Sequence, residues 1–267
     1  TCLKNKGSAV RFCLWPQVFN LKKVIKARKK LSYITNVLFK FFQLSLGYKE
    51  KRKDYGVEIF EYFYLPWRSD ENFKKHYELI KNHTLNPESR LFTLYEMSKR
   101  YLKEDSSFVE VGSWRGGVSG LIALENKNKD VDYFICDTFT GVVNSSEHDT
   151  FFKDKEYSDA AINDIKEIEN ISEQKFNIVT GVFPKSMEKV IIEKPISFAH
   201  IDVDTYISAK ESIEFVLSKS TKGAVIILDD YGGWFTDGVT KFGNELKKSE
   251  NLFVIPNHLG QLIIYKI

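Results

Sequence analysis

Two acidic segments stand in the last third of the chain, each directly after an apolar run that predicts a buried strand. Asp202 and Asp204 follow the first run, and Asp229 and Asp230 follow the second. In an open α/β sheet, the carboxyl ends of neighbouring parallel strands meet at the ligand crevice, so these carboxylates are expected to lie together. A divalent cation can offset their repulsion, and oxygen ligands favour Mg²⁺ or Mn²⁺ over Zn²⁺. The sequence therefore predicts a metal site at Asp202, Asp229 and Asp230, with helix capping or an ordinary loop start as the alternative.

A glycine-containing segment, residues 110–117, predicts a cofactor loop between a strand and the helix after it. Gly112 allows a tight turn, Gly116 allows close approach of the backbone to a ligand, and the helix N-terminus offers free N–H groups. The spacing differs from the G-x-G-x-x-G pattern of dinucleotide-binding proteins, which disfavours pyrophosphate. It suits a cofactor that carries a carboxylate and an amine, with Glu110 on the ammonium side. A glycine turn with a purely structural role is the alternative.

Two further strand ends complete the predicted cofactor site. Asp137 ends a strand 25 positions after Gly112, where an acid can accept hydrogen bonds from both hydroxyls of a ribose. The strand that ends before Gly181 is expected to lie beside the adenine. As a lone residue, Asp137 would more often cap a helix or lie in a solvated loop. The predicted cofactor contacts are Glu110, Gly112, Ser113, Arg115, Gly116, Asp137, Thr138, Gly181 and Asp202.

These residues need a scaffold of alternating strands and helices, which the pattern from residue 106 onward predicts. Apolar runs predict five strands separated by glycine turns and helical segments, at 106–113, 131–137, 175–181, 196–202 and 223–229. Two last runs, 252–256 and 260–267, predict a hairpin. The predicted fold is a doubly wound, mainly parallel, seven-stranded α/β sheet with a C-terminal antiparallel hairpin and a helical N-terminal extension.

The first part of the chain follows a different pattern, and we predict a domain boundary between 1–85 and 86–267. Residues 18–46 predict a basic helix with an increasingly apolar end, and residues 21–30 alone carry six Lys or Arg. Such a helix can lie on a membrane surface, dock on a partner or pack on its own domain. We expect the extension to serve substrate recognition or oligomer contacts. Asn86 is expected to cap a helix that has Pro87 in its first turn.

The composition narrows the class of protein and its partners. The 267 residues are 43% hydrophobic and 14% aromatic, which suffices for a large core, and the formal net charge of +3 disfavours a nucleic-acid partner. No apolar run is long enough for a transmembrane helix, and the N-terminus lacks the features of a secretory signal. Cys2, Cys13 and Cys136 show no metal-ligand spacing. A reducing, cytoplasmic setting is therefore expected.

Five motifs taken together resemble one enzyme family. They run in order from Arg90: RLFTLYEM, FVEVGSWRGG, CDTFTG, HIDVDTYIS and VIILDDYG. As a set they resemble the macrocin O-methyltransferase family, metal-dependent enzymes that methylate sugar hydroxyls with S-adenosylmethionine. The resemblance implies a Rossmann-like methyltransferase fold, which the C-terminal hairpin also favours over a dehydrogenase. It implies that the loop at Glu110, Gly112 and Gly116 surrounds the methionine moiety and that Asp137 holds the ribose. It also implies that Asp202, Asp229 and Asp230 hold the metal.

The resulting hypothesis is a metal-assisted transfer of a methyl group to an acceptor hydroxyl. Asp202 or Asp204 is expected to remove the hydroxyl proton, and His148 and His200 are secondary candidates. A sugar or glycosylated small molecule is the expected acceptor, and a catechol-like diol is the alternative. An inactive Rossmann-like binding protein, attached to membrane through residues 18–46, is a hypothesis from a different class, and a nucleotide-dependent dehydrogenase is a third. Peripheral membrane contact and homo-oligomer formation are both compatible with the N-terminal extension.

Overall fold

The computed structural model of the protein describes residues 21–45, 64–152 and 156–267. The chain divides into two compact units, Thr1–Tyr64 and Leu65–Ile267. The first unit contains helix α1, Leu21–Ser45, which agrees with the helix expected over 18–46. None of the described helices combines the length and the apolar content that crossing a bilayer requires. Cys136 is buried and free, whereas Cys2 and Cys13 lie outside the described residues.

The second unit is built on a seven-stranded sheet with the order β3-β2-β1-β4-β5-β7-β6. Its strands are β1 Ser106–Val111, β2 Val131–Asp137, β3 Phe176–Thr180, β4 Ile196–Ile201, β5 Ser220–Leu228, β6 Leu252–Pro256 and β7 Leu262–Lys266. Strands β1 to β5 run parallel, and β7 pairs antiparallel with β5 and with β6. This confirms the predicted mainly parallel sheet with its C-terminal hairpin. The strand order reverses between β1 and β4, the place where open α/β sheets bind ligands.

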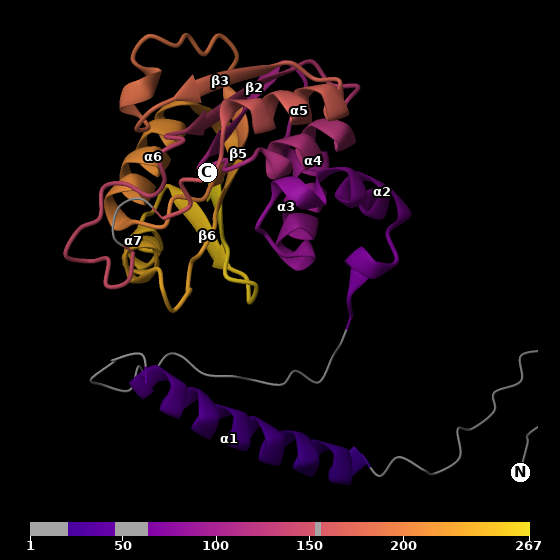
Figure 1. The fold of residues 1–267 in the computed structure, drawn as a ribbon, viewed down its shortest axis with the longest axis vertical. Helices are drawn as coiled ribbons and strands as arrows, with labels where there is room; N and C mark the ends of the chain where they lie inside the picture. The colour runs from indigo at the N-terminus through magenta and orange to yellow at the C-terminus, as the bar shows by residue number, and fades with distance from the viewer. Residues whose placement is uncertain (1–20, 46–63, 153–155) are drawn as a thin grey trace, which may run out of the picture. The chain divides into compact units, whose positions relative to one another are not determined.

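Helices cover both faces of the sheet (Figure 1). One layer is formed by α2 Glu71–Ile80, α3 Glu88–Tyr101, α4 Gly117–Glu125 and α5 Ile162–Ser172, and the other by α6 Tyr206–Lys219 and α7 Asp237–Leu246. Short 3-10 turns occur at η1 Pro66–Arg68, η2 Lys81–His83 and η3 Lys185–Met187. The elements therefore form three layers, helix on sheet on helix.

Alternation of side chains along the strands explains why both faces are covered. In β1, Phe108 packs against the α2–α5 layer and Val109 against the α6–α7 layer, and β4 does the same with Phe198 and Ala199. All four side chains are buried. Strands buried on both faces read as continuous apolar runs, which is the pattern that predicted them.

Helices α2 and α3 begin in different ways. Asp70 caps α2, because its Oδ1 accepts a hydrogen bond from the Phe73 N–H at 2.8 Å. Helix α3 begins differently from the expectation. Pro87 occupies the N-cap position, without a side-chain cap, and the Asn86 side chain instead donates to Asp202. The residue before α3 therefore contributes to the site rather than to the helix end.

Candidate active site

A cavity of about 280 Å³ opens at the carboxyl ends of the parallel strands. Its wall is formed by the ends of β1, β2 and β4 and by the segment 84–87 before α3. Nine of the predicted site residues line it: Glu110, Gly112, Ser113, Asp137, Thr138, Gly181, Asp202, Asp204 and Asp230. The predicted cofactor loop (residues 110–117) and the acidic cluster (Asp202, Asp204, Asp229 and Asp230) thus both contribute residues to one cavity, although Asp229 itself is not on its wall.

Asp137, at the end of β2, is held by backbone amides. Its Oδ2 accepts a hydrogen bond from the Trp114 N–H and its Oδ1 accepts one from the Phe139 N–H, both at 2.8 Å. Burial raises the pKa of Asp137, and the N–H groups that face the carboxylate oppose this rise. Each carboxylate oxygen has a second lone pair, so Asp137 can still accept hydrogen bonds from hydroxyls of a ligand in the cavity.

Two serine hydroxyls on the cavity wall indicate a polar ligand. Ser113, in the cofactor loop, and Ser212, in α6, are both buried, and neither Oγ has a hydrogen-bond partner among the described residues. Buried polar groups in native proteins are nearly always hydrogen-bonded, so each unpaired hydroxyl points to a missing partner. Thr138 and Gly181 complete this wall, and Gly181 has a φ of +125° that favours glycine.

Two predicted cofactor contacts, Arg115 and Gly116, are not on the cavity wall. The Arg115 guanidinium stacks on the Trp114 ring at 4.4 Å and donates to Asp159 Oδ2 at 2.9 Å. Gly116 has a φ of +79°, and a Cβ atom there would lie 2.8 Å from Ile165 Cδ1 in α5. The absence of a side chain at 116 therefore serves the packing of the loop on α5, whereas Gly112 and Ser113 face the cavity.

The acidic residues predicted from the ends of β4 and β5 do lie together. Carboxylate oxygens of Asp202, Asp204 and Asp230 are within 4.8 Å of one another, and the same holds for ligand atoms of His200, Asp202 and Asp229. Burial and then repulsion from Asp229 and Asp230 raise the pKa of Asp202 to about 8. Burial and the neighbouring Asp202 raise the pKa of Asp204 as well. Such a cluster favours a bound cation.

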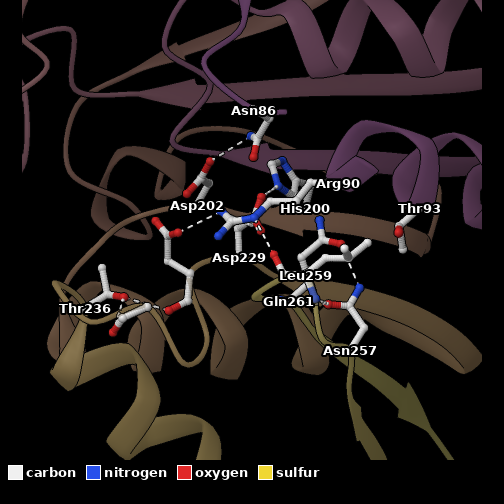
Figure 2. Close-up of polar contacts among 12 residues, drawn as sticks. Asn86, Arg90, Thr93, His200, Asp202, Asp229, Thr236, Asn257, Leu259 and Gln261 are labelled. Carbon is white, nitrogen blue, oxygen red and sulfur yellow. Dashed lines mark hydrogen bonds and ion pairs between the residues drawn. The ribbon is translucent and has the colours of Figure 1, made fainter. Parts of the chain in front are cut away.

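Arg90, from α3, brings a positive charge to this cluster (Figure 2). Its Nη1 donates to Asp230 Oδ1 at 2.8 Å and lies 3.4 Å from Asp229 Oδ1, while its Nε donates to the Leu259 carbonyl at 2.7 Å. Burial lowers the pKa of Arg90, but Asp229 and Asp230 outweigh this effect and raise it. Asp229 Oδ1 still has no hydrogen bond among the described residues. One guanidinium therefore leaves part of the cluster's charge unmatched.

His200, on β4, is fully buried between two carboxylates. Its Nδ1 lies 3.1 Å from Glu110 Oε1, and its Nε2 lies 3.1 Å from Asp229 Oδ2. A protonated imidazole donates from both ring nitrogens, which suits a position between two carboxylates. Burial lowers the pKa of His200, but the hydrogen bonds to Asp229 and Glu110 outweigh burial and raise it to about 10. His200 is therefore not a free base, and His148, the other candidate, is not among the residues that line the cavity.

Sequence reasoning missed the roles of Arg90 and Asn86. Asn86 Nδ2 donates to Asp202 Oδ2 at 3.2 Å (Figure 2). The two residues reach partners 116 and 140 positions further along the chain, so no local spacing reveals these contacts. The available signal was the motif RLFTLYEM, whose first residue is Arg90, although the motif by itself assigns no partner to that arginine.

The sequence matches the model of one protein family, and the fold is similar to solved structures. The family model for macrocin O-methyltransferase (TylF) matches residues 80–259. The O-methyltransferase NovP aligns with a TM-score of 0.54 and 18% identity, over 69% of this chain and 81% of its own. The calicheamicin methyltransferase CalS11 aligns with a TM-score of 0.56 and 14% identity, over 80% of this chain and 99% of its own. Cofactor-bound Rv0187 from MTB aligns with a TM-score of 0.51 and 11% identity, over 74% of this chain and 90% of its own. At these identities the solved structures show similarity of fold, and no curated protein matches the chain.

Proposed function

This chain belongs to the macrocin O-methyltransferase (TylF) family, and we propose that it methylates a hydroxyl of a sugar or a glycosylated small molecule with the help of a divalent metal ion. Membership of the family makes it an S-adenosylmethionine-dependent O-methyltransferase. The observation that carries the finer proposal is the shared cavity. The cofactor loop and Asp137 line one part of it, and the acidic residues Asp202, Asp204 and Asp230 line another. A methyl donor and an acceptor held there would meet at the strand ends.

The donor atoms of the acidic cluster fit a hard divalent cation. Its members are carboxylates, and both nitrogens of the nearby His200 are already bound to Glu110 and Asp229. Asp229 Oδ1 is buried without a hydrogen bond among the described residues. These features favour Mg²⁺ or Mn²⁺ over Zn²⁺. We assign the metal to Asp202, Asp229 and Asp230. When bound, it would lower the pKa of an acceptor hydroxyl.

The protein's own residues supply positioning and a proton acceptor. Asp137 and the cofactor loop orient S-adenosylmethionine, and Asn86 fixes the Asp202 carboxylate through its 3.2 Å hydrogen bond. In the transfer, the acceptor oxygen forms a bond to the methyl carbon as the bond from carbon to sulfur breaks. S-Adenosylhomocysteine leaves, and the hydroxyl proton passes to a carboxylate. Because Asp202 is assigned to the metal, Asp204 on the same cavity wall is the proton acceptor that this proposal favours over Asp202.

Methyl transfer to a panel of acceptors tests this function. Purified protein is given S-adenosylmethionine with glycosides, free sugars or catechols, in Mg²⁺ or in EDTA, and S-adenosylhomocysteine is quantified. We expect transfer to a glycoside or sugar in Mg²⁺ and its loss in EDTA. Transfer to catechols alone would establish the diol alternative, and transfer that is indifferent to EDTA would overturn the metal assignment. Asp204→Asn is expected to lower kcat while Mg²⁺ binding is retained.

The N-terminal helix α1 has features that suit binding to a membrane surface. Helix α1 carries seven Lys or Arg and no Asp or Glu. Leu31, Ile34, Leu38 and Phe41 recur along it at helical spacing and are exposed. A basic helix with an apolar stripe suits the surface of an anionic membrane. We therefore propose peripheral membrane contact through α1.

A further inference from the structure

A hydrogen-bonded chain crosses the sheet between the cofactor loop and the acidic cluster. Glu110 lies near the end of β1, where the cofactor loop starts. His200 lies beside it on β4, and Asp229 follows β5. The imidazole contacts the carboxylates on its two sides at 3.1 Å each. All three side chains are at most 1% exposed, so water does not replace either contact.

The chain continues from Glu110 into helix α4. Glu110 Oε2 accepts a hydrogen bond from the Ser119 N–H at 3.1 Å and another from the Ser119 hydroxyl. Ser119 lies in the first turn of α4, the helix that begins directly after the cofactor loop. The four residues therefore connect the helix that supports the cofactor loop with Asp229, one of the residues we assign to the metal.

We propose that His200 is a positioning residue that couples metal binding at Asp229 to cofactor binding at the loop. The inference rests on the proposed function, because it needs a metal and S-adenosylmethionine on the same protein. A metal bound through Asp229 fixes that carboxylate. Through His200, it then fixes Glu110 and the start of α4. A cofactor that binds afterwards then loses less conformational entropy in ordering the loop, so each ligand tightens the binding of the other.

Calorimetric titration with S-adenosylhomocysteine, with and without Mg²⁺, measures this coupling directly. In the wild-type protein we expect Mg²⁺ to lower the Kd for S-adenosylhomocysteine about fivefold or more. In His200→Asn both ligands should still bind, and the change in Kd should fall below about twofold. The matched control is His76→Asn, which removes a histidine that pairs with Glu125 at 3.3 Å away from the cavity. This control should keep the full coupling.

A second measurement needs no substitution, because removing a buried histidine from between two carboxylates can prevent folding. In the wild-type protein, Mg²⁺ alone should shift the nuclear magnetic resonance signals of the His200 ring and of the Ser119 amide, while the His76 ring stays unchanged. Absence of a Ser119 shift when Mg²⁺ binds overturns the inference.

The outcomes separate the two proposals. If the wild-type protein shows no heat of Mg²⁺ binding, the metal assignment fails and the coupling fails with it. If Mg²⁺ and S-adenosylhomocysteine both bind but neither changes the affinity of the other, the metal assignment stands and the coupling is wrong. Coupling that survives undiminished in a folded His200→Asn protein shows that it runs by another route.

Discussion

A Cβ atom on Gly112 would lie 1.7 Å from the carbonyl oxygen of Asp202. The backbones of the cofactor loop and the acidic cluster are therefore in contact. At the same place, the Asp202 N–H donates a hydrogen bond to the Val111 carbonyl at 2.8 Å. No side chain other than hydrogen fits at 112 without parting the ends of β1 and β4. The distance between the donor side and the acceptor side of the cavity thus depends on this glycine.

Gly112→Ala is expected to damage both stability and cofactor binding. The substitution adds the clash with Asp202 to the strain of a φ of +82°, for a loss of about 4 kcal/mol or more in the free energy of unfolding. Gly232→Ala is the matched control. Gly232 has a φ of +81° and nothing within 4 Å of its Cβ position, so only strain of about 1–2 kcal/mol applies. Chemical denaturation measures the free energy of unfolding of both variants. Equal losses in Gly112→Ala and Gly232→Ala would contradict the close-approach argument.

Asp137→Asn should weaken cofactor binding without unfolding the protein. An amide offers one acceptor oxygen where the carboxylate offers two, so the variant cannot keep the bonds to Trp114 and Phe139 and also accept two ribose hydroxyls. Loss of a charged hydrogen bond predicts a rise of about tenfold to a hundredfold in the Kd for S-adenosylhomocysteine. Asp132→Asn, on the same strand but off the cavity wall, should leave the Kd unchanged. An unchanged Kd in Asp137→Asn would remove the ribose assignment.

Arg90→Met should destabilise the metal-free protein more than the metal-bound one. Without Arg90, Asp229 and Asp230 lose their guanidinium and the Leu259 carbonyl loses its donor. We expect a loss of about 2 kcal/mol, seen as a fall of about 4–8 °C in the midpoint of thermal unfolding. Because Mg²⁺ would supply positive charge to the same carboxylates, it should recover part of the fall. A midpoint that drops equally with and without Mg²⁺ would show that Arg90 and the metal do not share the cluster.

Thermal unfolding with ligands tests the cofactor and the metal together. A ligand at a hundredfold excess over its Kd stabilises the folded state by about 2.7 kcal/mol, which predicts a rise of about 5–10 °C in the midpoint. We expect this rise with S-adenosylmethionine, a further change with Mg²⁺, and none with NAD. Asp230→Asn should abolish the Mg²⁺ effect, whereas Asp159→Asn, paired with Arg115 off the cavity wall, should retain it. A rise with NAD and none with S-adenosylmethionine would contradict the assignment of the cofactor loop.

The full chain should sediment with anionic vesicles through α1. We expect binding to vesicles of phosphatidylcholine with phosphatidylglycerol, weaker binding at high salt, and none to phosphatidylcholine alone. Ile34→Ser combined with Leu38→Ser should abolish it. Tyr33→Ser is the control, because Tyr33 is 71% exposed but lies off the stripe of Leu31, Ile34, Leu38 and Phe41. Sedimentation that the double variant does not change would contradict a role for the apolar stripe.

The sheet and the strand-end residues were predictable because they depend on local patterns. Runs such as ISFAHI are buried on both faces, and parallel strands bring their carboxyl ends to one edge, so Asp202 and Asp229 had to lie close together. The same rule placed Asp137 and Gly181 on the shared cavity. The cytoplasmic setting, the homo-oligomer and the acceptor stay predictions.

The contacts that were not predictable are those made by helix packing. The docking angle of α3 on the sheet decides that Arg90 reaches Asp230 and Leu259, and no periodicity in the sequence encodes that angle. Gly116 shows the reverse case. A glycine beside a ligand and a glycine beside another helix have the same sequence signature, and the structure places Gly116 against Ile165.

Strand β6 has β7 as its neighbour in the sheet, although β6 is made first. In a nascent chain that has been made only as far as β6, this strand therefore lacks its partner, and one edge of β5 is unpaired. Strand β7 joins the two, and the turn between β6 and β7 carries the Leu259 carbonyl that accepts a hydrogen bond from Arg90. Chains that stop before β7 would leave the edge of β5 and the strand β6 unpaired, and unpaired strand edges favour aggregation.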